Sequence, residues 1–278
     1  MDKVLTQIED YYDAVPRAAA DVEEHGPFTI FVSRITWPFY ARPSQSHVGP
    51  AATTADVLAL RERLRALRVP ESIEWVDEVT PGLVEPVLEA GLTVERLPLQ
   101  VLDSLTERPA PAGTRVRLVP PDDPDLARIN QTVHLGFGSA GTAVGDVGPA
   151  ERDAAALTAD AAGVEQLRDR IRRGLTVMAV ASDDEGPLAA GSHQPVGPVS
   201  EVVGVATLPT ARRRGLGATV TAALVADAHA KGIETIFLSA GSDDVARVYE
   251  RVGFRRVATA CIAELPTTDV SNTEASSH

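Results

Sequence analysis

Hydrophobic and polar residues follow each other along the second half of the chain in patterns that predict alternating strands and helices. Apolar runs predict strands at about 115–119, 176–181, 188–193, 199–208, 235–239 and 256–264. Apolar residues at three- and four-residue spacing predict helices at about 125–135, 164–173, 215–231 and 243–252. The strand 199–208 is nearly continuously apolar, as in a strand buried on both faces. Gly232 and Gly253 follow the last two helices, where glycine commonly ends a helix.

The first half repeats part of this pattern. It predicts strands at 28–32, 72–76 and 92–102 and helices at 54–67 and 81–90. This order of elements is the same as that of 199–264, which suggests one fold used twice. Ahead of it, Ile8, Tyr11, Tyr12 and Val15 indicate an amphipathic helix that packs on a core.

Irregular segments divide the chain. Two prolines and a glycine within 108–113 resist both helix and strand, which indicates a linker. The segment 136–148 is rich in glycine and small residues, and we expect the polar tail 266–278 to be mobile. The predicted organisation is a first domain at 1–107, a linker at 108–114, a second domain at 115–265 and a flexible tail at 266–278.

Composition narrows the class of protein. The 278 residues carry a net charge of −13, which argues against nucleic-acid binding because a protein that grips phosphates needs a basic face. We expect a soluble, cytoplasmic protein without a membrane partner, since the chain has no apolar run of about 18 residues and its start does not resemble a signal peptide. Cys261, the single cysteine, excludes an internal disulfide and is expected to be a small buried hydrophobe. The histidines show no metal-ligand spacing, so no metal site is predicted.

The informative segment is the glycine turn after the strand 199–208. It contains Arg212, Arg213 and Arg214 followed by Gly215, Leu216 and Gly217, and a long helix begins there. Backbone N–H groups of such a turn meet the positive end of the helix dipole and can bind a phosphate or pyrophosphate. The arginines place positive charge where an acidic protein needs it to hold an anion.

Four interpretations of this turn are open. A Walker A loop needs a lysine that is absent here, and a dinucleotide-binding loop would need glycine in place of Val220. A purely structural turn with a charged rim is the third. The fourth is the Q/R-x-x-G-x-G/A signature of the GNAT superfamily of acyl-CoA-dependent N-acyltransferases, which Arg212, Gly215 and Gly217 satisfy. The segment 249–254, Tyr-Glu-Arg-Val-Gly-Phe, also resembles that family's closing element.

The resemblance covers about 115–265 and implies an α/β fold with a mixed, mostly antiparallel sheet flanked by helices. It also implies two GNAT-like units in tandem, the first of them shortened and degenerate. The aromatic loop 37–43 replaces the glycine turn there, so we expect no acyl-CoA site in the first unit. Trp37, Phe39 and Tyr40 either line an acceptor pocket or are buried between domains.

Site residues follow from the same resemblance. Tyr249 is the candidate general acid for the leaving thiolate, with packing against the cofactor or core as the alternative. Ser242 stands where many members have asparagine, and it can still cap its helix. The residues expected to bind acetyl-CoA are Val205, Ala206, Thr207, Arg212, Arg213, Arg214, Gly215, Leu216, Gly217, Ala218 and Ser242, the first three through their backbone.

The family motif fixes no general base. Glu201, on the strand before the turn, is the best-placed carboxylate, and a solvated residue at a strand end is the alternative. His193 is a second candidate, with a structural role as its alternative. The resemblance implies an N-acetyltransferase that moves an acetyl group from acetyl-CoA to a primary amine of a small molecule or peptide. A catalytically silent acyl-CoA-binding or regulatory module is the alternative function.

Overall fold

The computed structural model describes residues 3–35, 38–139 and 141–266, which form two compact units. The larger unit combines residues from 1–15 and 97–258, and the smaller unit combines residues from 16–96 and from 259 onward. This grouping differs from a division at 107, because the first fifteen residues and 97–107 lie with the larger unit. The tail 267–278 and Trp37 are outside the described residues.

The sheet of the larger unit is mixed and mostly antiparallel. In spatial order its strands are β5 (Thr93–Leu102), β10 (Thr235–Ser239), β9 (Val199–Thr207), β8 (Gly186–Val196), β7 (Val177–Asp183) and β6 (Arg115–Leu118). The β9–β10 pair is parallel, whereas the pairs β5–β10, β6–β7, β7–β8 and β8–β9 are antiparallel. The fold class predicted from the sequence is therefore confirmed.

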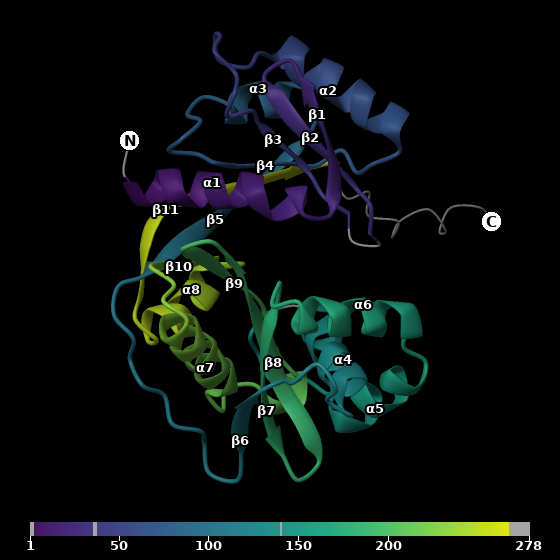
Figure 1. Ribbon diagram of the computed structural model, residues 1–278, viewed down its shortest axis with the longest axis vertical. Helices are drawn as coiled ribbons and strands as arrows, with labels where there is room; N and C mark the ends of the chain where they lie inside the picture. Colours follow the sequence, from purple (N-terminus) through teal and green to yellow (C-terminus); the bar gives the residue numbers. More distant parts are fainter. Residues whose placement is uncertain (1–2, 36–37, 140, 267–278) are drawn as a thin grey trace, which may run out of the picture. The chain divides into compact units, whose positions relative to one another are not determined.

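Helices cover both faces of this sheet (Figure 1). Ala179 and Ala181 of β7 pack with α7 (Leu216–Ala230) and α8 (Asp243–Glu250), and we call that side the α7 face. The alternate residues Met178 and Val180 pack with α4 (Leu126–Phe137) and α6 (Ala161–Arg172), on the α4 face. Side chains alternate along a strand, so each residue's neighbours assign its face. Helix α5 (Pro149–Leu157) and a 3-10 turn, η1 (Pro209–Ala211), were not predicted.

Helix α1 (Lys3–Arg17) confirms the predicted amphipathic helix and belongs to the larger unit up to Val15. The Tyr11 and Tyr12 rings meet the Phe237 ring edge to face, at centroid distances of 5.0 and 5.3 Å. Phe237 is fully buried. Because Phe237 lies on β10, the first residues of the chain complete the core of the second half.

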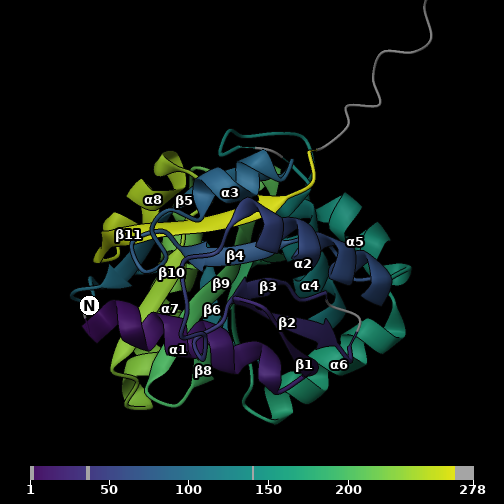
Figure 2. The ribbon, with the colours of Figure 1, turned by 90° about the horizontal axis from the view of Figure 1, so that it is seen from above.

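The smaller unit has its own sheet and core. Its strands are, in spatial order, β1 (Ala20–His25), β2 (Phe28–Ser33), β3 (Ala41–Pro43), β4 (Ile73–Val76) and the end of β11 (Phe254–Glu264). Helices α2 (Thr54–Leu67) and α3 (Val84–Glu89) pack on β4 and β11 (Figure 2). Cys261 is fully buried in this core, as predicted, and burial raises the pKa of its thiol to about 11. Phe39 and Tyr40 are half-buried, and the loop predicted at 37–43 includes β3.

The predicted repeat is present, but its last strands are exchanged. In the repeat, β4 corresponds to β10 and β5 corresponds to β11. Strand β10 pairs with β5, through Phe237 opposite Val101, and strand β4 pairs with β11, through Trp75 opposite Cys261. Each half of the chain therefore lends its last strand to the other half's sheet. Among the described residues, no helix is long and apolar enough to cross a bilayer.

Candidate functional site

The parallel ladder between β9 and β10 ends early. It joins Thr235 to Val199, Ile236 to Ser200 and Phe237 to Glu201, and no later pair of these strands is found among the described residues. We call the region beyond the Glu201–Phe237 pair the strand opening. On its β9 side lie Val205, Ala206 and Thr207, the residues expected to bind the cofactor through their backbone. Beyond Glu201, the β10 side of β9 is therefore left without a strand partner among the described residues.

A bulge in β9 lies next to the opening. The β8–β9 register shifts so that Gly191 of β8 faces Gly204 and Val205 of β9, and Gly204 has a positive φ of 65°. A Cβ on Gly191 would lie 2.7 Å from Val205 Cγ2. Glycine at this point of β8 therefore lets the bulge form. An isolated glycine within an apolar strand is the sequence signal for a bulge, and Gly204 is such a residue.

The glycine turn leaves the start of α7 without a side-chain cap. Thr53, Asp160 and Ser242 cap α2, α6 and α8 through their side chains, whereas α7 begins after Gly215 with no such hydrogen bond. The first N–H groups of a helix have no intrahelical acceptor, so those of residues 216–218 remain available to an anion. Leu216 itself points into the core, so only its backbone can take part.

Gly217 lies beside the strand opening. A Cβ built on it would be 3.7 Å from Thr207 Oγ1 and 3.9 Å from Val205 Cγ1, which is ordinary contact distance. Val205, Thr207, Gly217 and Ala218 are all half-buried, whereas Ala206 is buried against Gly136 of α4. The turn and the unpaired part of β9 thus form one continuous, partly accessible surface on the α7 face.

The three arginines of the turn have different surroundings. The Arg212 guanidinium donates to the carbonyl oxygens of Gly136 and Ser139, at 2.9 and 2.7 Å, and to that of Ala143 at 3.1 Å. It therefore holds the segment after α4 rather than projecting freely. Arg213 is exposed, has a positive φ of 65° and forms no ion pair with the described residues. The Arg214 guanidinium lies 4.0 Å from the Asp183 carboxylate and is 41% exposed.

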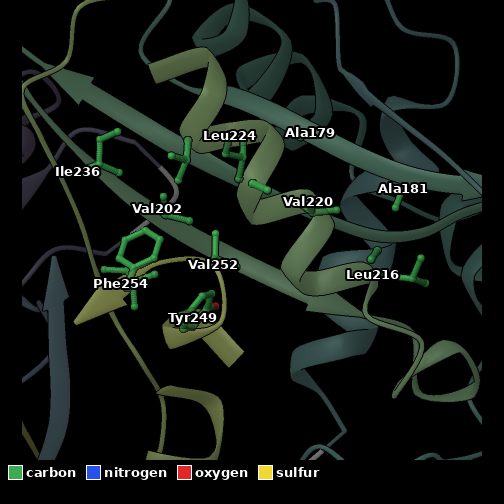
Figure 3. Close-up of a cluster of buried hydrophobic side chains, with 14 of the residues drawn as sticks. Ala179, Ala181, Val202, Leu216, Val220, Leu224, Ile236, Tyr249, Val252 and Phe254 are labelled. Atoms are coloured by element: carbon green, nitrogen blue, oxygen red, sulfur yellow. The ribbon is translucent and has the colours of Figure 1, made fainter. Parts of the chain in front are cut away.

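Tyr249 lies on α8, on the α7 face, within the core cluster that Figure 3 shows. Its ring meets that of Phe254 at a centroid distance of 6.1 Å. The residue is 9% exposed, and burial raises the pKa of its hydroxyl to about 12. The hydroxyl therefore keeps its proton at neutral pH, as a proton donor must. No hydrogen bond of this hydroxyl is found among the described residues.

Two side-chain hydrogen bonds hold the first turn of helix α8. The Ser242 side chain accepts from the Val245 N–H at 3.2 Å, so the predicted cap is confirmed. Gln100 of β5 donates from Nε2 to the Ala246 carbonyl at 3.4 Å. No local pattern predicts this contact, because Gln100 belongs to the other half of the repeat.

Glu201 lies on the α4 face, because its neighbour Val202 packs with α7. Tyr249 is thus on the other face of the sheet from Glu201. The Tyr12 hydroxyl of α1 donates to Glu201 Oε1 at 3.2 Å and lies 3.2 Å from Ser239 Oγ. Sequence reasoning missed this contact, since no local pattern links residues so far apart in the chain.

The His193 imidazole is enclosed by hydrogen-bond partners inside the larger unit. It is fully buried, with Nδ1 2.8 Å from Ser200 Oγ and Nε2 2.9 Å from Asp227 Oδ2 of α7. Lys231 Nζ lies 2.7 Å from the same Asp227 oxygen. Burial lowers the pKa of the imidazole. With both ring nitrogens engaged and no exposed surface, His193 links two strands to α7, which favours the structural alternative over the base.

Comparisons with known proteins agree with this architecture. The family described as FR47-like protein matches residues 172–263, which include the bulge, the glycine turn and Tyr249. No curated protein matches the chain.

Solved structures match over most of the chain. A GCN5-related N-acetyltransferase from Kribbella flavida has a TM-score of 0.70 and 23% identity, over 98% of this chain and 99% of that one. A GNAT-family acetyltransferase from Novosphingobium aromaticivorans gives 0.51 and 20%, over 91% and 94%. A tandem GNAT protein from the clavulanic acid biosynthesis pathway gives 0.52 and 16%, over 87% and 79%. The chain thus has the fold of the GCN5-related N-acetyltransferases, in a tandem arrangement.

Proposed function

We propose that the larger unit transfers an acetyl group from acetyl-CoA to a primary amine of a small molecule or peptide. One observation carries the proposal: the unpaired part of β9 and the uncapped start of α7 form a single surface. The backbone of Val205–Thr207 can pair with the pantetheine arm as an added strand would. The N–H groups of residues 216–218, with Arg213 and Arg214 nearby, suit the pyrophosphate.

The two candidate catalytic residues, Glu201 and Tyr249, lie on opposite faces of the sheet, so each can act on a different side of the reacting carbonyl carbon. The amine attacks the thioester carbonyl, so that an N–C bond forms, the C–S bond breaks and coenzyme A leaves as a thiolate. Glu201, on the α4 face, accepts the amine proton directly or through water. Tyr249, on the α7 face, donates a proton to the thiolate, which its raised pKa permits. The strand opening between them is where the acyl group would lie.

The test is an assay of the full chain with acetyl-CoA and a panel of amines, in which release of the free thiol is followed. We expect acyl transfer to at least one amine. We also expect calorimetry to show that acetyl-CoA binds when no amine is present. Binding without transfer to any acceptor would support the silent module instead.

The Tyr249→Phe variant tests the acid. We expect a turnover roughly a hundredfold lower, within the range for general acids, with acetyl-CoA affinity nearly intact. A fully active variant would leave Tyr249 with a packing role only. The variant keeps an aromatic ring at position 249, so the core around Phe254 is preserved.

A further inference from the structure

The Tyr12 hydroxyl lies where β9 and β10 separate. Glu201 is the last residue of β9 that pairs with β10, and Ser239 is the last residue of β10. The Tyr12 oxygen is 3.2 Å from Glu201 Oε1 and 3.2 Å from Ser239 Oγ. A side chain from the first helix thus joins the two strands at the start of the strand opening.

The direction of the two hydrogen bonds follows from their chemistry. An ionised carboxylate only accepts, and a phenolic hydroxyl has one proton to give. Tyr12 therefore donates to Glu201 and accepts from the Ser239 hydroxyl. Two hydrogen bonds in series polarise each other, and Tyr12 is only 7% exposed, which strengthens both.

Tyr12 has little freedom to leave this position. Its ring packs edge to face on Phe237 and lies 5.9 Å from the Tyr11 ring. Helix α1 is also tied to β10 through Gln7, whose side-chain oxygen accepts from Thr235 Oγ1 at 3.1 Å. The hydroxyl is therefore held rigidly beside the Glu201 carboxylate.

From this geometry we propose that Tyr12 is a positioning residue for Glu201, with Ser239 supporting it. The proposal rests on the proposed function, in which Glu201 is the base. The hydroxyl stabilises the ionised carboxylate and holds it at the start of the strand opening. The first helix of the chain thereby becomes part of the catalytic apparatus of the second half.

Helices α1 and α6 carry further ionisable groups among the described residues, and Asp10 and Asp13 flank the two tyrosines on α1. Glu9 lies one helical turn before Tyr12 on α1 and is buried. Arg170 of α6 donates to Thr176 Oγ1 at 3.2 and 3.3 Å, directly before β7. Gln194, opposite Glu201 on β8, is neutral. Glu9 and Arg170 are unchanged in the variants below. Their electrostatic effect is therefore the same in every chain that is compared.

The experiment compares Tyr12→Phe with Tyr11→Phe in the full chain. Tyr11 is a matched control, because its ring also packs on Phe237 while its hydroxyl donates to the Gln194 backbone carbonyl at 2.8 Å. We measure kcat/KM for the amine against pH. In Tyr12→Phe we expect the ascending limb to move to higher pH by about one unit, the equivalent of one hydrogen bond. On the acidic side of the limb, kcat/KM then falls about tenfold, with the KM for acetyl-CoA unchanged.

Tyr11→Phe should leave the limb in place, and Ser239→Ala should move it in the same direction by less. A Tyr12→Phe profile that coincides with that of Tyr11→Phe overturns the proposal. If Tyr12→Phe does not fold, Ser239→Ala decides, because it weakens the same hydroxyl from the other strand.

A carbon-13 NMR titration of the Glu201 carboxyl, assigned with Glu201→Gln, gives a readout without turnover. We expect its midpoint to rise in Tyr12→Phe, and an unchanged midpoint contradicts the proposal. If the wild-type chain transfers no acetyl group, the proposed function fails. If transfer requires Glu201 but is indifferent to Tyr12, only the positioning role fails.

Discussion

At the scale of single residues, Gly215 and Gly217 have different reasons to be glycine. Gly215 has a φ of 83°, a conformation that side chains rarely adopt, so the turn itself requires it. Gly217 has no positive φ, and the protein leaves room for a Cβ there. The fold does not need glycine at 217. Under the proposed function, a side chain there would obstruct bound acetyl-CoA.

This contrast gives a prediction for Gly217→Ala. The variant should be as stable as the wild type or up to about 1 kcal/mol more stable, because alanine favours the helix. Acetyl-CoA binding should nevertheless weaken, and a bulky residue at 217 should weaken it at least tenfold. Urea unfolding and calorimetry measure the two effects separately. Unchanged affinity with the bulky residue would refute the cofactor assignment.

Gly215→Ala is the matched control for the same turn. It should lose about 1 kcal/mol of stability, since alanine must adopt the left-handed conformation. A Gly215→Ala chain as stable as the wild type would mean that the turn relaxes into another conformation.

At the scale of elements, the network of His193, Ser200, Asp227 and Lys231 ties β8 and β9 to α7. Burial lowers the pKa of His193 in the folded chain below its ordinary value. The unfolded chain therefore takes up this proton first as the pH falls. Stability from this group is complete above a pH of about 6.5 and is lost as the pH falls below it.

His193→Gln should reduce that dependence. From pH 7.5 to 5.5 the wild type should lose more unfolding free energy than the variant, by at most about 1.4 kcal/mol per pH unit below 6.5. Urea unfolding at both pH values measures the difference, and all other titrating groups are common to the two chains. Equal losses in both chains would show that folded His193 takes up its proton as readily as unfolded His193 does, which contradicts a lowered pKa.

At the scale of the whole molecule, the second half does not complete its own core. Residues 99–101 of β5 pair with β10, and α1 covers Phe237. A chain of 108–278, which begins at the predicted linker, lacks both elements. We expect it to unfold without a sharp transition in urea, whereas the full chain should show one. A cooperative transition in 108–278 would contradict this view of the core.

Most helices and strands could be predicted from the sequence, because the spacing of apolar residues and the glycines that end helices are local signals. The helix 54–67 and the strand 235–239 have the predicted bounds. The glycine turn and the cap at Ser242 were predicted for the same reason. By contrast, the Tyr12–Glu201 and Gln100–Ala246 contacts depend on which strand pairs with which, and that choice leaves no local trace. The exchange of β5 and β11 is a choice of this kind.

Because of the exchanged strands, β4 must wait during synthesis for its partner strand β11. Strand β4 is complete when the ribosome has passed Val76, but its partner residues 260–263 are synthesised much later. At the usual rate of translation, the interval is roughly ten to forty seconds. Throughout that time one edge of the nascent sheet offers unpaired backbone groups to any neighbouring strand. The nascent chain should therefore depend on chaperones until β11 has emerged.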